Sequence, residues 1–169
     1  MQVVADTSAL VSLGVVADRS PNPLDCVLAA HELFVPARVL EELAETAAYD
    51  DSSGRAAATV LDRRDRFVVR EVNLDEAFPL DDGENAAVRL ANDIEATQFY
   101  CDEFNQLALI HASLTTARLV TTPILLVVLV RTGEISAINA KTLLDEISEK
   151  RSWSGNAYVT RARETLRKS

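Results

Sequence analysis

Short apolar runs alternate along the chain with stretches in which apolar positions recur every three or four residues. The short runs are typical of buried strands, and the longer periodic stretches are typical of amphipathic helices. The runs predict strands over residues 2–5, 33–35, 67–72, 97–101 and 119–121. Because strands alternate with helices, we expect a parallel sheet that is covered by helices on both faces.

The periodic stretches predict a series of helices between and after these strands. Thr7 and Ser8 are expected to cap the first helix, and proline is expected to open two later ones, at Pro36 and at Thr122-Pro123. Residues 49–54 and 73–82 are expected to form the two clearest loops. The expected helices span 9–17, 24–31, 55–65, 82–92, 104–113 and 139–151, besides those opened at 36 and 122 and a final one after 155.

The simplest organisation is one α/β domain over residues 1–150, with residues 151–169 as a basic helical C-terminal extension of that domain. Two of the predicted strands end on an acidic residue, at Asp6 and at Asp102. Ligand sites of open parallel sheets form beyond the carboxyl ends of the strands. Two carboxylates at that edge repel each other unless a cation lies between them, and Mg²⁺ is a natural candidate.

Glu42 and Glu84 are candidates to complete an acidic site, on the helices that follow the second and third strands. Each also has a structural interpretation: Glu42 on a solvated helix face, and Glu84 as a favourable charge in a first helical turn. Other phosphate chemistry fits poorly. Ser8 stands where an aspartyl phosphatase needs its second aspartate, and the five glycines form no phosphate-binding loop.

Composition restricts the partners and the surroundings of the protein. The 169 residues carry 26 acidic and 17 basic side chains, a net charge of −9, which excludes a general nucleic-acid coat protein. Only three of the basic residues are lysines, which favours a protein of a salt-loaded cytoplasm over an acidic mesophilic protein. At 1 M salt the Debye length falls to about 3 Å, so an acidic surface there opposes a polyanionic substrate less strongly.

Two further features indicate a soluble cytoplasmic protein. Cys26 and Cys101 form no disulfide or zinc pattern, which is typical of a reducing compartment. Asp6 interrupts the apolar start, so no signal peptide is expected, and the apolar run at 124–130 is too short for a membrane span. That run is either part of a homodimer interface or a buried core helix.

Positive charge is concentrated at the C-terminal end of the chain. These side chains either contact the phosphate backbone of a nucleic acid or form a solvated helix face. The candidate nucleic-acid-binding residues are Arg151, Arg161, Arg163 and Arg167.

Five segments together resemble the PIN domain, a fold common among nucleases and toxins of VapC type. They are Val-Val-Ala-Asp-Thr-Ser-Ala-Leu at 3–10, Val-Pro-Ala-Arg-Val-Leu-Glu-Glu-Leu at 35–43, Asp-Gly-Glu-Asn-Ala-Ala at 82–87, Tyr-Cys-Asp-Glu at 100–103, and Val-Thr-Thr-Pro-Ile-Leu at 120–125. The resemblance covers residues 1 to 150 and implies a three-layer α/β/α fold. It implies that Asp6, Glu42, Glu84 and Asp102 are the catalytic and metal-binding quartet, that Glu103 assists, and that Thr7 or Ser8 orients a ligand.

The resemblance implies an endoribonuclease that hydrolyses RNA with Mg²⁺ or Mn²⁺, as the toxin of a toxin–antitoxin pair or on its own. The third acid stands in a Gly-Glu pair where VapC-like toxins usually have Asp. The Gly-Glu variant occurs in one subgroup of the family, and Asn105 and Gln106 stand where that subgroup often has an Arg. These departures leave a second hypothesis open, a catalytically weak or inactive module that binds RNA or a partner protein. A DNA-directed structure-specific nuclease is a third.

Overall fold

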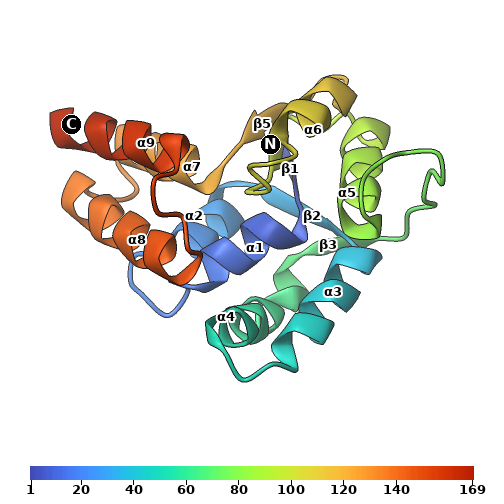
Figure 1. Cartoon of the computed structure of the whole chain (residues 1–169), viewed down its shortest axis with the longest axis horizontal. Coiled ribbons are helices and arrows are strands. Elements are labelled where there is room, and N and C mark those ends of the chain that lie inside the picture. The colour runs from blue at the N-terminus through green and yellow to red at the C-terminus, as the bar shows by residue number, and fades with distance from the viewer.

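The computed structural model describes residues 1–169, and a parallel five-stranded sheet lies at its centre (Figure 1). The strand order is β3-β2-β1-β4-β5, so β1 pairs with both β2 and β4. In this register Val4 stands opposite Phe34 on one side and Phe99 on the other. The strands are β1 (Gln2–Ala5), β2 (Glu32–Pro36), β3 (Val68–Arg70), β4 (Gln98–Tyr100) and β5 (Arg118–Val120).

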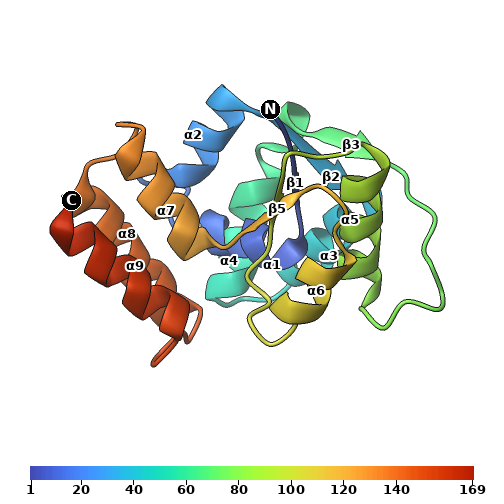
Figure 2. The ribbon, with the colours of Figure 1, turned by 90° about the horizontal axis from the view of Figure 1, so that it is seen from above.

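Helices cover both faces of the sheet and give the three-layer α/β/α architecture that the sequence predicts. Helix α5 packs against β1, β2 and β4 on one face, while α1 and α2 lie on the other and contact α7 (Figure 2). The helices are α1 (Thr7–Gly14), α2 (Pro23–Ala30), α3 (Ala37–Ala47), α4 (Ser52–Leu61), α5 (Asp82–Asp93), α6 (Leu107–Ser113), α7 (Thr122–Arg131), α8 (Ala137–Lys150) and α9 (Ala157–Lys168), with a 3-10 turn over Arg64–Arg66.

The apolar run at 124–130 belongs to α7 and is largely buried within its own chain. Leu125, Leu126 and Leu129 are buried, because α2, α8 and α9 pack around this helix. The core-helix interpretation therefore accounts for the run without a second copy of the chain. No helix of the structure combines the length and the apolar character that crossing a membrane requires.

The last two helices pack back onto the body of the molecule. α9 contacts both α7 and α8, and the ring of Phe104 lies against Trp153 and Tyr158, with ring centroids 5.1 and 5.3 Å apart. Residues 104–106 form a turn, and α6 begins only at Leu107, not at Phe104 as predicted. This aromatic cluster brings the end of α8 close to the loop that follows β4.

The predicted cap of α1 is wrong, and the correction bears on the site. Asp6 is the N-cap residue, because its carboxylate accepts a hydrogen bond from the N–H of Ala9 at 2.9 Å. Thr7 and Ser8 lie inside the first turn, which frees their hydroxyls for other partners. The predicted loop at 49–54 is also too long, because Asp51 caps a helix that begins at Ser52.

Candidate functional site

Asp6 lies at the carboxyl edge of the sheet, where β1 ends and α1 begins. Its N–H donates to the carbonyl of Tyr100 on β4 at 3.1 Å, so the ends of the two neighbouring strands are tied together. The side chain is only 1% exposed. A carboxyl group is thus held at the end of the central strand, where the parallel topology gathers the ends of the other strands.

The hydroxyl of Ser8 connects the two acids that the sequence places after strands. It donates to the Asp6 carboxylate, 2.8 and 2.9 Å from the two oxygens. It also accepts the N–H of Asp102 at 2.9 Å. In the structure this one hydroxyl fixes the carboxylate of Asp6 relative to the backbone after β4, and the predicted role of Thr7 or Ser8 in orienting a ligand stays a prediction.

Asp102 is held by Thr122, the first residue of α7. The N–H of Thr122 donates to one carboxylate oxygen at 2.7 Å, and its hydroxyl donates to the other at 2.6 Å. Burial raises the pKa of the Asp102 carboxyl, and the two bonds from Thr122 counteract that rise. Both oxygens have a donor, so the arrangement stabilises the charged form of a carboxylate that is only 4% exposed.

Glu42 reaches the site from α3 and is held by two groups. The hydroxyl of Thr7 donates to its carboxylate, and the backbone N–H of Gly83 also stabilises its charged form. A β-carbon at position 83 would overlap the Glu42 carboxylate. Gly83 is therefore the residue that allows the carboxylate to approach the first turn of α5, which gives the Gly-Glu pair a steric reason.

Glu84 takes part in the cap of α5 and also lies beside Asp6. Its N–H donates to the carboxylate of Asp81, the N-cap of α5, at 2.8 Å, and its own carboxylate is stabilised by the backbone of Asp81. This is a reciprocal capping box. The residue is only 8% exposed and its charge interacts with that of Asp6, so Glu84 closes the helix cap and also lies among the acids of the site.

These side chains line one pocket of about 410 Å³ at the carboxyl edge of the sheet. The predicted residues Asp6, Thr7, Ser8, Glu42, Glu84, Glu103 and Arg151 all line it. Asp102 does not, and both of its carboxylate oxygens accept hydrogen bonds from Thr122. The remaining lining residues are Val11, Glu45, Thr46, Ser53 and Asp81.

Burial and crowding of like charges perturb the acids of this pocket. Burial raises the pKa of Asp6 to about 7, and the charge of Asp102 adds to the rise. Burial likewise raises the pKa of Glu84 to about 7, with further contributions from Asp81, Asp6 and Glu103. The pKa of Glu42 is raised by burial as well. Such a group of carboxylates is the kind that a cation stabilises.

The donor set fits a hard divalent cation in kind, because it consists of carboxylate and hydroxyl oxygens with few basic neighbours. The structure contains no group of three or more His, Cys, Asp or Glu side chains arranged to hold a metal ion. Thr7 and Thr122 occupy oxygens of Glu42 and Asp102 instead.

A model of one protein family matches residues 2–168 and is described as a PIN domain. The chain belongs to the PIN-domain family. No curated protein matches the sequence. PIN domains are in general nucleases that use divalent metal ions, and the acidic pocket lies where the PIN fold brings the ends of β1 and β4 together.

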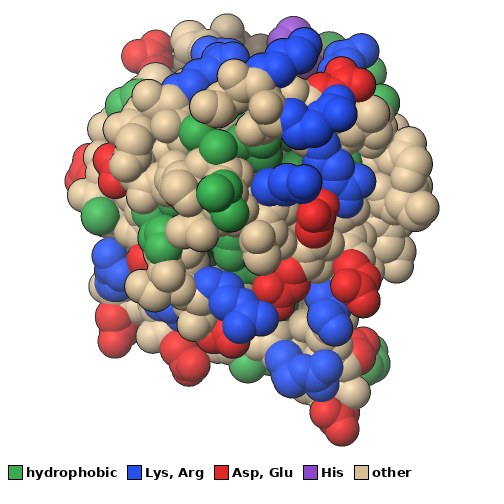
Figure 3. Space-filling model, turned by 90° about the vertical axis from the view of Figure 1, so that its left-hand side faces the viewer, with side chains coloured by type: hydrophobic (Ala, Val, Ile, Leu, Met, Phe, Trp, Pro, Cys, Tyr) green, Lys and Arg blue, Asp and Glu red, His purple; other side chains and the backbone are tan.

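The C-terminal arginines of this PIN domain fall into two groups. Figure 3 looks onto the side of the molecule where α8 and α9 lie, and Lys and Arg side chains gather on the upper part of that face. Arg161, Arg163 and Arg167 belong to α9, and none of them lines the acidic pocket. Arg163 instead pairs with Asp145 at 2.8 Å. Only Arg151 is brought to the acids.

Sequence reasoning missed three residues that shape the pocket of this PIN domain. Asp81 caps α5 and adds a carboxylate to the lining, Gly83 makes room for Glu42, and Thr122 holds Asp102. The Asp-x-x-Glu spacing of a capping box points to Asp81. Nothing local points to Thr122, which lies 20 residues from its partner.

Proposed function

We propose that this PIN domain is a metal-dependent endoribonuclease whose active site is the acidic pocket. The observation that carries the proposal is the convergence of carboxylates from separate elements: Asp6 after β1, Glu42 on α3, Glu84 on α5 and Glu103 after β4. A buried carboxylate cluster is costly to the fold unless it binds something positive. The presence of this carboxylate cluster in one pocket therefore supports a functional role.

In this proposal Asp6, Glu42, Glu84 and Glu103 hold Mg²⁺ or Mn²⁺, and Asp102 positions Ser8 and Asp6 from behind. A divalent cation in such a site lowers the pKa of bound water and stabilises charge on a phosphodiester. Ser8 keeps Asp6 oriented, and Thr7 and Gly83 keep Glu42 oriented. The family supports this chemistry in general terms, and RNA as the substrate is the proposal's own step.

A matched pair of variants on α3 tests the pocket. Glu42→Gln removes a pocket carboxylate, while Glu41→Gln removes its exposed neighbour, which pairs with Arg38 outside the pocket. We expect Glu42→Gln to lower the rate of RNA cleavage at least 100-fold in Mg²⁺ or Mn²⁺, since an oxygen ligand of the metal is lost. Glu41→Gln is expected to cleave like the parent. Equal rates in the two variants would refute the assignment.

Two observations favour a second candidate function, a module that binds RNA without cutting it. The acids are not gathered into a metal-holding group, and the oxygens of Asp102 are both bonded to Thr122. This candidate predicts saturable RNA binding and no product under any divalent metal. Cleavage that depends on Glu42 would eliminate it.

The remaining proposals concern the cellular setting. A toxin role predicts that expression arrests growth and that Asp6→Asn restores it, with an antitoxin as the natural inhibitor. A homodimer predicts a mass by light scattering of about twice the 18.5 kDa of the chain. The cytoplasmic location and the salt-adapted, haloarchaeal origin predict full activity at molar salt, and loss of structure in molar KCl would contradict them.

A further inference from the structure

Arg151 is the one basic residue among those that line the acidic pocket. It follows directly after α8 as the C-cap residue, and its N–H donates to the carbonyl of Ile147 at 2.8 Å. Six acidic side chains share the pocket with it: Asp6, Glu42, Glu45, Asp81, Glu84 and Glu103. A single guanidinium in such surroundings needs an explanation.

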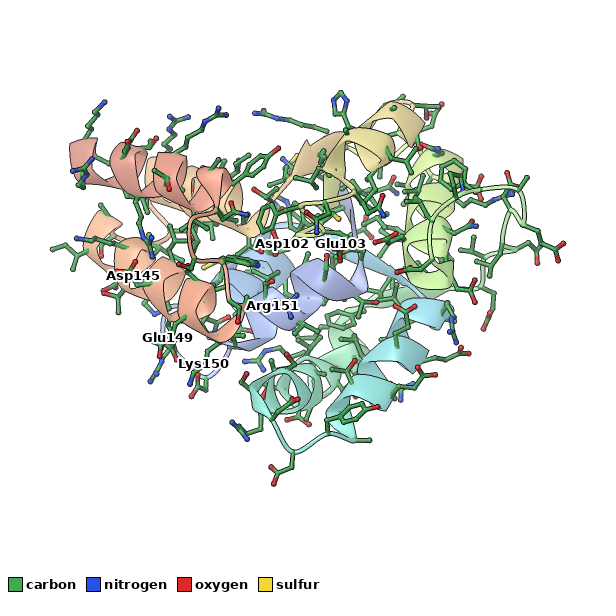
Figure 4. The ribbon with its side chains drawn as sticks, viewed as in Figure 1. Asp102, Glu103, Asp145, Glu149, Lys150 and Arg151 are labelled. Carbon is green, nitrogen blue, oxygen red and sulfur yellow. The ribbon has the colours of Figure 1, made fainter.

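The helical register of α8 explains why Arg151 points inward when its neighbours do not. Residues three and four apart lie on the same face of a helix. Ile147 and Ser148 are buried, so position 151 continues the buried face, whereas Glu149 and Lys150 are exposed. Figure 4 shows this difference, with Arg151 toward the centre of the molecule and Glu149 and Lys150 along the outer edge of α8.

The guanidinium of Arg151 has no ion-pair partner, although it lies in an acidic pocket. No carboxylate oxygen is within 4.0 Å of it, and its Nε is buried without a hydrogen-bond partner. Other arginines beside α8 are paired: Arg19 with Glu146 and Arg163 with Asp145. The charge of Arg151 helps to lower the pKa of Asp102, but no direct ion pair joins the two, so the fold directs this cation toward the pocket and leaves its side-chain donors available to bind.

A free guanidinium matches the phosphate group in both charge and geometry. Its planar fork can give two parallel hydrogen bonds to the oxygens of a phosphodiester. The six pocket acids repel a polyanion, so a strand that enters needs a local positive contact besides any metal. We propose that Arg151 binds a backbone phosphate of the RNA in the acidic pocket, and that the arginines of α9 do not. The identity of the ligand rests on the proposed function.

Three variants test this proposal, each checked for an unchanged melting temperature. Arg151→Gln removes the cation, Lys150→Gln removes the neighbouring exposed cation, and Arg151→Lys keeps the charge without the planar fork. We expect Arg151→Gln to lower kcat/KM for a labelled single-stranded RNA roughly 10- to 100-fold, the range for a charge-assisted hydrogen bond. Lys150→Gln is expected to match the parent, and Arg151→Lys to recover only part of the loss.

Equilibrium binding supplies a second readout that does not require cleavage. The logarithm of the binding constant K falls linearly with the logarithm of the salt concentration. For single-stranded nucleic acids, each phosphate contact adds about 0.7 to the magnitude of this slope. We expect Arg151→Gln to reduce this slope by about 0.7 relative to the parent, and Arg151→Lys to restore it. A role for Arg151 in packing alone would change the melting temperature and leave the slope unchanged.

The outcomes separate this proposal from the proposed function. If the parent protein cleaves RNA and Arg151→Gln behaves like Lys150→Gln in both kcat/KM and slope, the proposed phosphate contact of Arg151 is wrong and the proposed nuclease activity is supported. If the parent binds RNA without cleaving it, the nuclease is wrong, and a reduced slope in Arg151→Gln still supports the phosphate contact. If the parent neither cleaves nor binds RNA, both proposals are overturned.

Discussion

Replacing Asp6 by Asn is expected to stabilise the metal-free protein while abolishing its activity. The carboxyl is 1% exposed, and burial raises its pKa from 3.8 to about 7. Asn offers an amide oxygen to the N–H of Ala9 in place of the carboxylate oxygen of Asp, and it is as good an N-cap residue as Asp. The substitution therefore removes a buried charge without removing the cap of α1.

The magnitude follows from the pKa. The pKa of Asp6 is higher in the folded state than in the unfolded state. The contribution of this carboxyl to the free energy of unfolding is therefore fully present below pH 3.8 and is lost as the pH rises through about 7. The difference between 3.8 and about 7 corresponds to about 4 kcal/mol at roughly 1.4 kcal/mol per unit. Asn is still a buried polar group and retains part of the cost of burial. We therefore expect Asp6→Asn to raise the free energy of unfolding by about 2 kcal/mol at pH 8.

Urea unfolding in EDTA at pH 5 and pH 8 measures the effect, with Glu41→Gln as an exposed control. The gain of Asp6→Asn over the parent should grow with pH between these values, and the control should show no such trend. A variant that is less stable than the parent at pH 8, or a difference that does not depend on pH, would refute the reasoning. A simple loss of folding would appear as instability at both pH values.

Three further predictions concern the groups around this carboxylate. Gly83→Ala places a β-carbon against the Glu42 carboxylate, so RNA cleavage should fall at least 10-fold while the melting temperature shifts by a few degrees; full activity would show that Glu42 does not need this approach. Thr122→Val removes the hydroxyl from Asp102 and should lower the free energy of unfolding by about 1–3 kcal/mol, with Thr122→Ser close to the parent in urea titrations. Mg²⁺ at about 100 times its Kd should stabilise the parent at pH 8 by about 2.7 kcal/mol and should stabilise Asp6→Asn much less, as thermal unfolding would report.

The fold could be predicted from sequence because its signals are local. β1 contains a short apolar run, Val3 to Ala5, that is followed directly by Asp6, and the other strands are likewise short and mainly apolar, so the order of elements follows from short-range periodicity. Asp6 lies at the edge of the sheet because it follows the last residue of β1 directly. Parallel pairing of β1 with β4 then brings the residues after each strand together.

The interior of the site depends on contacts that no local pattern encodes. Both carboxylate oxygens of Asp102 are bonded to Thr122, which stands at the start of another helix, and Asp102 does not line the pocket. Arg151 belongs to a basic segment by composition, and only its register on α8 directs it to the acids while Arg163 pairs elsewhere. Tertiary packing decides these contacts, and composition does not.

RNA cleavage with and without a divalent metal shows most directly whether the acidic pocket is the active site of a metal-dependent nuclease. The parent, Asp6→Asn and Asp102→Asn are incubated with mixed RNA in Mg²⁺, in Mn²⁺ and in EDTA, at low and at molar salt. We expect cleavage by the parent in Mg²⁺ or Mn²⁺, none in EDTA, and none by either variant under conditions where both remain folded. Cleavage in EDTA, or equal cleavage by Asp6→Asn, would contradict it.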